Sequence, residues 1–495
     1  MKQPVSFLLI LFLVFPGFTF GEVFQAEQRP TVTKPTVTSP DIDQITTYLT
    51  GQTLSLSQAV RLCLTTNHTI ALARANLYVA QGRTSEAYAA LNPTLGSALD
   101  VIRLNEPVVN KGLITLDPKN FDKPIGAEIT NSNIQQKLVG VTAQLPIDIS
   151  GSIQVASEQA KFQEQAYRQD LDRTRNQVIG DVKGAFFAAL RAEALEKVAE
   201  ESLKNSQDRL HDATSKFAAK VVTRFDVLRA KTDLAVSQQN LIVAKNTVRT
   251  YLATLNLILG IQVTTDIQLT EEGAIQIPSN SGMLNPQADG KLGPEFDADL
   301  KEALANRPEI KEATFYIEAA QKGITLARRS ELPSFNLSFS YLYAPNAGGT
   351  SPLINTWQAQ AVLSVPIFDG GVARARHQEA QGNLSGAETV KRQTIDGVTL
   401  DSEQAFLALN EARQRVDVAS QSLKQAQEAF QLAKVRYQAG VSSRAGISPL
   451  LELSDAQAAL TLAESNQVNA LYDFNSASAR LDRALGRYAT IDLGK

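Results

Sequence analysis

Two carboxylates near the end of the chain have the type and spacing that could form a chemical site. Glu452 and Asp455 lie three residues apart at the expected start of a helix, so both side chains point to one face. Several copies meeting around one axis would bring such pairs together as a cation-attracting ring. Acidic residues in a first helical turn also interact favourably with the helix dipole, and capping is therefore the competing interpretation.

The chain contains few other residues suited to catalysis or metal binding. Its three histidines are widely separated, and Cys63, the single cysteine, has no partner for a disulfide. Neither an H-E-x-x-H pattern nor a G-x-x-x-x-G-K-[ST] phosphate loop occurs. We therefore expect no enzyme activity, no metal and no cofactor. A formal net charge of −3 also gives no sign of nucleic-acid binding.

The N-terminus predicts export from the cytoplasm. Residues 1–21 combine Lys2, an apolar run and a small-x-small site ending at Gly21, as in a secretory signal peptide. The apolar run is shorter than the roughly 20 residues of a membrane helix. Residues 22–52 are rich in threonine and proline, which predicts an extended N-terminal segment.

Long helices are expected to position the carboxylate pair. Proline is absent from 147–277 and from 367–448. In the second stretch, small and apolar residues alternate spacings of four and three, the heptad period of a coiled coil. These residues are Ala405, Leu409, Ala412, Val416, Ala419, Leu423, Ala426, Phe430, Ala433 and Tyr437. A similar stripe occurs in the first stretch, with polar residues at two of its positions. We therefore predict helical hairpins at 151–259 and 371–485.

Four segments change from the heptad period to a period of two, which is typical of β-strands. They are 94–103, 135–146, 334–343 and 357–366. Strands of roughly ten residues can cross a bilayer at a tilt, with an apolar face outward and a polar face inward. A half-buried sheet in a soluble domain would alternate in the same way. The aromatic residues Tyr341, Tyr343 and Trp357 gather toward one end, where an interfacial girdle would lie.

A spanning sheet cannot leave strand edges in lipid, because each unpaired backbone N–H or C=O there costs several kcal/mol. Four strands are too few for a membrane barrel, whose smallest form has about eight. If these strands span the membrane, several copies of the chain must therefore close one shared barrel.

The whole pattern occurs twice. We predict a first repeat at 53–260, an equatorial linker at 261–300, a second repeat at 301–486 and a C-terminal tail at 487–495. Each repeat has a helix, a strand pair and a helical hairpin. Repeated order of this kind indicates one elongated body rather than several independent domains.

In this order the chain resembles the TolC-type outer-membrane efflux proteins. The opening helix beginning at Leu54, the Arg307-Pro308-Glu309-Ile310 motif and the turn from Val365 to Gly371 are similar to the family's. The stretches 437–441 and 452–456 resemble its second hairpin tip and the helix after it. His68 stands where the matching first-repeat position would have proline.

The resemblance implies an α+β membrane protein that forms a trimer. Three chains would share a twelve-stranded transmembrane β-barrel, four strands from each, and a long periplasmic α-helical coiled-coil barrel. It also implies a location in the cell outer membrane, in contact with its lipid. The implied function is that of an exit duct for a tripartite efflux pump or a type I secretion system. The implied partners are a periplasmic adaptor (membrane fusion protein) and an inner-membrane transporter.

The resemblance also assigns roles at the hairpin tips. Glu452 and Asp455 match the carboxylates that ring the tunnel entrance, while Asp226 and Tyr437 match a gate latch in which Arg444 is the nearest candidate arginine. The adaptor would dock on two tips. One is Ala439-Gly440-Val441, and the other is Ala219-Lys220-Val221, where lysine replaces the usual glycine. This lysine could select a particular adaptor, or it could equally be a solvated tip residue, the commoner fate of a lone lysine.

A second interpretation is a periplasmic coiled-coil adaptor or scaffold protein without a membrane barrel. Adaptors also contain helical hairpins, but they have no reason to repeat two amphipathic strand pairs. An outer-membrane trimer would favour the duct, and a soluble periplasmic protein would favour the scaffold.

Overall fold

The computed structural model describes residues 51, 53–103, 109–111, 128–130, 135–271, 294–344, 354–441 and 448–490. All of these residues belong to one compact unit, Val37–Lys495. The expected signal peptide at 1–21 and nearly all of the segment at 22–52 lie outside the described residues. So do Arg444 and much of the linker predicted at 261–300.

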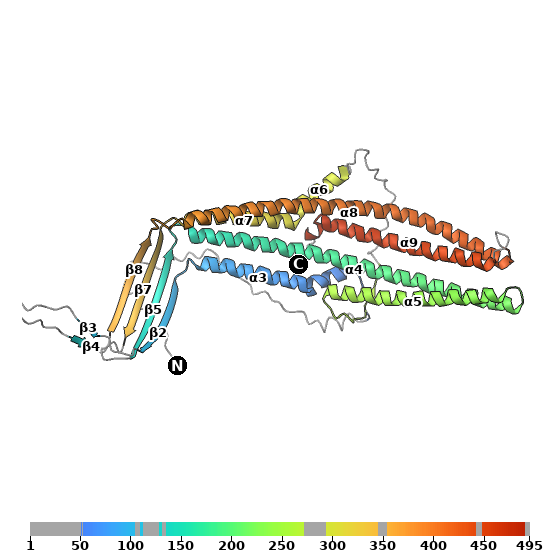
Figure 1. Ribbon diagram of the computed structural model, residues 1–495, viewed down its shortest axis with the longest axis horizontal. Helices are drawn as coiled ribbons and strands as arrows, with labels where there is room; N and C mark the ends of the chain where they lie inside the picture. Colours follow the sequence, from blue (N-terminus) through green and yellow to red (C-terminus); the bar gives the residue numbers. More distant parts are fainter. Residues whose placement is uncertain are drawn as a thin grey trace, which may run out of the picture. The chain divides into compact units, whose positions relative to one another are not determined.

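The same order of elements occurs twice (Figure 1). The first copy consists of α2 (Leu56–Thr66), α3 (His68–Ala89), β2 (Thr94–Arg103), β5 (Gln135–Ile147), α4 (Ser152–Ala218) and α5 (Arg224–Leu259). The second consists of α6 (Pro294–Asn306), α7 (Pro308–Arg329), β7 (Ser334–Ala344), β8 (Ile354–Ser364), α8 (Val372–Ala439) and α9 (Pro449–Ala484). Short pairs β1 (Thr53–Leu54) with β6 (Gln268–Leu269) and β3 (Val109–Lys111) with β4 (Glu128–Thr130) complete the described strands.

The helices pack as neighbours in a definite order. Helix α4 packs against α3 and α5 on one side and against α7 and α9 on the other, and α8 packs against α7 and α9. Helices α4 and α8, of 67 and 68 residues, are each about 100 Å long at 1.5 Å per residue. The chain therefore has two outer helical edges, one formed by α3 and α5 and the other by α8.

The heptad stripe forms the packed face of the second hairpin. Ala412, Val416 and Ala419 of α8 are buried against Ala470 and Phe474 of α9. A second cluster nearer the tip contains Ala433, Tyr437, Leu450 and Leu453. Small residues at these positions allow the two helix axes to approach closely, and the α8–α9 pair forms the coiled-coil hairpin expected from the heptad period.

The four long strands form one antiparallel sheet in the order β2-β5-β7-β8. Its register brings like residues onto the same face. Phe339 pairs with Ala143 and Ala359, while the neighbouring Ser338 pairs with Gln144 and Gln360. The apolar face therefore continues across all the strands. Strands β2 and β8 each have one neighbour in this sheet, which leaves two open edges within the described chain.

The predicted bounds of the last strand need a correction. Strand β8 covers Ile354–Ser364 rather than 357–366. Its final pair is Ser364 with Ser334, the first residue of β7. Because β7 offers no partner beyond Ser334, Val365 and Pro366 lie outside the sheet.

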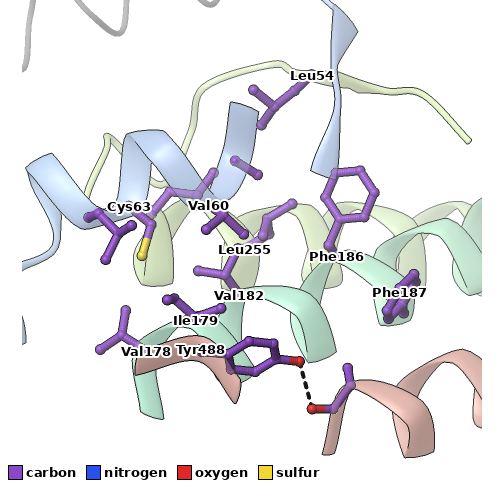
Figure 2. Close-up of a cluster of buried hydrophobic side chains, with 14 of the residues drawn as sticks. Leu54, Val60, Cys63, Val178, Ile179, Val182, Phe186, Phe187, Leu255 and Tyr488 are labelled. Carbon is purple, nitrogen blue, oxygen red and sulfur yellow. Dashed lines mark hydrogen bonds between the residues drawn. The ribbon is translucent and has the colours of Figure 1, made fainter. Parts of the chain in front are cut away.

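The main apolar core lies where α2, α4, α5 and the segment around Tyr488 meet (Figure 2). Phe186 of α4 and Leu255 of α5 are fully buried there, and the free Cys63 of α2 is buried beside them. Burial raises the pKa of the Cys63 thiol to about 12, so it behaves as a small apolar side chain.

The segment predicted as a C-terminal tail begins inside this core. The short 3-10 helix Arg487–Thr490 places Tyr488 among the buried side chains, where its hydroxyl donates to the Ala479 carbonyl at 2.7 Å (Figure 2). Arg487 is ion-paired with Glu302 of α6 at 2.9 Å. The tail is therefore packed through residue 488.

Within the described ranges, no helix has both the length and the apolar composition that crossing a membrane requires.

Candidate functional site at the hairpin tips

Helices α4 and α8 end at the hairpin tips with the same backbone hydrogen bonds. The Val221 N–H donates to the Lys216 carbonyl at 2.9 Å, and the Val441 N–H donates to the Arg436 carbonyl at 3.0 Å. Each is the long hydrogen bond that closes a helix through a left-handed residue. Val221 and Val441 are 70% and 59% exposed, so both turns present an apolar side chain outward.

The left-handed residue differs between the tips. Gly440 has φ +73°, whereas the matching residue of the first tip, Lys220, has φ +60°. Lys220 is the only non-glycine residue with positive φ in the part of the chain that the structure describes. A side chain in this conformation costs roughly 1–2 kcal/mol, a cost that glycine avoids. The first tip therefore keeps a strained lysine in a turn of unchanged geometry.

Asp226 joins the two hairpins. It occupies the third position of a capping box with Thr223 at the start of α5. Its second oxygen accepts a hydrogen bond from the hydroxyl of Ser448, the residue that caps α9, at 3.1 Å. Burial by itself would raise the pKa of this carboxyl, but the hydrogen bonds from Thr223 and Ser448 outweigh it and hold the pKa below the ordinary value.

Tyr437 lies close to Asp226 without bonding to it. The Lys216 ammonium lies 3.5 Å from the centroid of the Tyr437 ring and donates to the Tyr437 carbonyl at 3.1 Å. The buried tyrosine hydroxyl has no hydrogen-bond partner among the described residues. Burial, together with the charges of Asp212 and Asp226, raises the pKa of this hydroxyl. The structure thus places the two expected latch residues near each other, while Asp226 bonds to Thr223 and Ser448.

A second row of polar contacts joins the hairpins one helical turn or two away from the tips. The Ser454 hydroxyl of α9 donates to Asp233 of α5 at 3.0 Å. Arg229 of α5 lies 4.0 Å from Asp455 of α9. Sequence reasoning did not identify Ser448, Ser454 or Asp233, because their partners lie more than two hundred residues away along the chain.

Glu452 and Asp455 have different surroundings. Arg436, at the end of α8, donates to Glu452 at 2.6 Å, and the Glu452 side chain is 19% exposed. The Asp455 side chain is 73% exposed. The structure therefore ties the first carboxylate across its own hairpin and leaves the second facing solvent. Arg436 and Arg229 are arginines that the described residues place beside this carboxylate pair, and the expected Arg444 lies outside them.

The aromatic residues of the sheet lie on its apolar face. Tyr341 pairs directly with Trp357, and the Trp357 ring stacks on Phe339 with centroids 6.4 Å apart. Tyr343 follows on the same face and pairs with Val139. Trp357 is 66% exposed. These side chains therefore form one aromatic cluster on the apolar face, at the end of the sheet remote from the helices.

The described residues contain no group of three or more histidine, cysteine or acidic side chains arranged to hold a metal ion.

Comparison with known proteins agrees with this arrangement. The family described as "Outer membrane efflux protein" matches residues 59–261 and 300–487, so its two segments coincide with the two copies of the fold. A pyoverdine export outer membrane protein, OpmQ of Pseudomonas putida, is 24% identical over 87% of this chain and 85% of its own length. The solvent efflux pump outer membrane protein SrpC of Pseudomonas putida is 26% identical over 73% of each chain.

Solved structures share the fold at low sequence identity. The outer-membrane channel OprN superposes with a TM-score of 0.67 and 21% identity, over 90% of this chain and 91% of its own. The Campylobacter jejuni CmeC outer membrane channel superposes with a TM-score of 0.66 and 19% identity, over 87% and 85%. These likenesses establish the TolC-like fold.

Proposed function

Because the chain belongs to the outer membrane efflux protein family, we propose that it is the outer-membrane exit duct of a tripartite efflux pump or a type I secretion system. The observation that carries this function is the sheet β2-β5-β7-β8. One face of it is apolar across all four strands, and within the described residues neither β2 nor β8 has a second partner strand. Such a sheet in lipid needs other copies to pair its edges.

We propose a homotrimer whose shared barrel contains four strands from each chain. Both outer helical edges support this assembly. On α5, Val236, Ile242 and Val243 are exposed, and on α8, Val418 and Leu432 are exposed. Packing α8 of one copy against α5 of the next would remove both apolar edges from water and close the helices into a tunnel.

The tunnel entrance would be held closed by the contacts between hairpins. Asp226 with Ser448 and Asp233 with Ser454 connect the first hairpin to the second within one chain. Asp455, which is exposed, would supply the cation-attracting ring at the entrance, while Arg436 restrains Glu452. Movement of one hairpin relative to the other would break these contacts and widen the entrance.

A periplasmic adaptor would dock on the tips and connect the duct to an inner-membrane transporter, which supplies the energy and selects the cargo. The relatives are named for export of pyoverdine and for efflux of solvents. The interpretation as an adaptor or scaffold is not favoured, because the relatives are named as outer membrane components of export systems.

The decisive experiment places arginine on each face of strand β7. Phe339→Arg puts a charge on the apolar face near the strand centre, and Ser338→Arg puts the same charge on the polar face. An arginine facing lipid at mid-membrane costs about 2–4 kcal/mol. We expect Phe339→Arg to reduce the amount of heat-modifiable trimer in outer-membrane fractions, and Ser338→Arg to assemble normally with altered single-channel conductance. Equal assembly of the two variants would show that the apolar face does not contact lipid.

A further inference from the structure

The first hairpin tip carries an exposed surface that is both apolar and basic. We call this surface the first-tip patch and define it as Phe217, Lys220, Val221, Arg224 and Phe225. Val221 is 70% exposed, Phe225 is 68% exposed and Phe217 is 44% exposed. Lys220 and Arg224 are exposed as well. Side chains of this size are rarely gathered at the end of a helical hairpin unless something covers them.

The charge of the patch has no compensating partner in the described part of the chain. Among the described residues, neither Lys220 nor Arg224 forms a side-chain hydrogen bond or an ion pair. The acidic residue nearest in sequence, Asp226, is buried and bonded to Thr223 and Ser448. The patch therefore presents positive charge next to apolar side chains.

The described part of the second tip, through Val441 and from Ser448 onward, differs at the left-handed position. Its turn has the same hydrogen bonds, but Gly440 stands at the left-handed position and adds no side chain. Its nearby charges, Arg436 and Glu452, are bonded to each other. The comparison shows that the turn itself does not require lysine, since glycine makes the same turn without strain. The lysine therefore adds to the tip an exposed positive charge that the turn itself does not need.

We propose that the first-tip patch binds the tip of a helical hairpin in a periplasmic partner protein, and that this partner tip presents a carboxylate beside apolar side chains. The carboxylate would pair with Lys220, and the apolar side chains would cover Val221 and Phe225. The partner site rests on the proposed function, because it is the adaptor contact of the duct. It assigns the preference for an acidic partner tip to Lys220, which has glycine as its counterpart in the second hairpin.

Charge complementarity of this kind mainly sets which partner binds and how fast it arrives. The effect should also weaken with salt, because an exposed pair is screened beyond about 8–10 Å at 0.1–0.15 M ionic strength. An exposed ion pair changes affinity by a factor of about two to five. The test must therefore compare matched probes at low and high salt.

The probes are three designed antiparallel helical hairpins that are identical except for one tip residue, which is glutamate, glutamine or lysine. Each carries a fluorophore, and binding to the full-length channel in detergent is followed by anisotropy. We expect the glutamate hairpin to bind about fivefold more tightly than the glutamine hairpin at low salt. This preference should disappear in Lys220→Gly and reverse toward the lysine hairpin in Lys220→Glu.

Lys204→Glu is the matched control, because Lys204 is an exposed lysine of α4 away from the tip. It changes the net charge as much as Lys220→Glu and should leave the preference intact. Lys220→Gly is expected to fold, since glycine adopts the φ of +60° without strain. A preference for the glutamate hairpin that persists in Lys220→Gly and Lys220→Glu would overturn the proposal.

Two further measurements complete the test. Vesicles of phosphatidylglycerol replace the hairpins in one series, and binding to them with the same dependence on residue 220 would overturn the proposal in favour of a lipid headgroup. Single-channel conductance in planar bilayers is measured on the same samples. A parent protein that forms no channel would contradict the proposed function. If the protein conducts but its preference among the three hairpins does not depend on Lys220, the acidic partner alone is contradicted.

Discussion

Removing the Ser454 hydroxyl should loosen the tips without weakening the helix that carries it. The Ser454 hydroxyl donates to Asp233 across the two hairpins at 3.0 Å, and both residues lie within helices. Ser454→Ala deletes this contact and leaves the N-cap of α9, Ser448, in place. Alanine is also the better helix former by a few tenths of a kcal/mol. The substitution therefore separates the stability of α9 from the closure of the tips.

The magnitude follows from the type of bond. A hydrogen bond to a charged group contributes about 1.5–3 kcal/mol, and partial exposure of this pair lowers the expected value to about 1–2 kcal/mol. At 1.4 kcal/mol for each factor of ten, the ratio of open to closed tips should rise roughly 5- to 30-fold in each protomer. A double-mutant cycle with Asp233→Ala should give a coupling energy of the same size.

The assay is single-channel recording in planar bilayers, combined with thermal unfolding. We expect Ser454→Ala to increase the open probability, and to lower the free energy of unfolding by no more than the about 1–2 kcal/mol of the deleted contact. Ser465→Ala is the control, because among the described residues that hydroxyl bonds only to the Thr461 carbonyl of the same helix, at 2.8 Å. If Ser454→Ala and Ser465→Ala gave the same open probability, the contact would not hold the tips closed.

Other substitutions test the core, the tips and the charged joint between α4 and α7. Phe186→Ala should cost about 3–5 kcal/mol of unfolding free energy in chemical denaturation, because the ring is fully buried. Lys220→Gly should raise that free energy by about 1 kcal/mol by relieving the left-handed backbone; a loss would show that the lysine is unstrained. Tyr437→Phe should leave conductance and stability nearly unchanged, because its hydroxyl has no partner among the described residues, whereas Tyr437→Ala should lower stability. Burial and the charge of Asp170 raise the pKa of Glu312 to about 7, even though Arg173 is 3.6 Å away. Its protonated form therefore favours folding fully below about pH 4.5, and this contribution is lost as pH rises through 7. Glu312→Gln should raise the melting temperature at pH 8 and leave it unchanged at pH 4, and a pH-independent difference would contradict the assignment.

The two carboxylates at the tips differ in a way that their spacing in the sequence did not predict. Their spacing placed Glu452 and Asp455 on one helix face and suggested equal roles. In the structure Arg436 bonds to Glu452, and Asp455 faces solvent. Spacing along one helix could not predict this difference, because it depends on which neighbouring helix each side chain meets. The same reason explains why Asp226 is bonded to Ser448, which the sequence did not single out.

By itself, the sequence determined the repeat, the long helices and the two faces of the sheet. Those properties are periodic: a spacing of 3.5 residues puts one stripe on a helix, and a spacing of two puts alternate residues on opposite faces of a strand. Phe339 and Ser338 were separated in this way before any partner strand was known. Only the tertiary structure decided where β8 ends, that Tyr488 enters the core, and that Lys220 adopts the conformation of a glycine. Each of these depends on a partner far away in sequence, or on a turn whose geometry overrides the preference of a single residue.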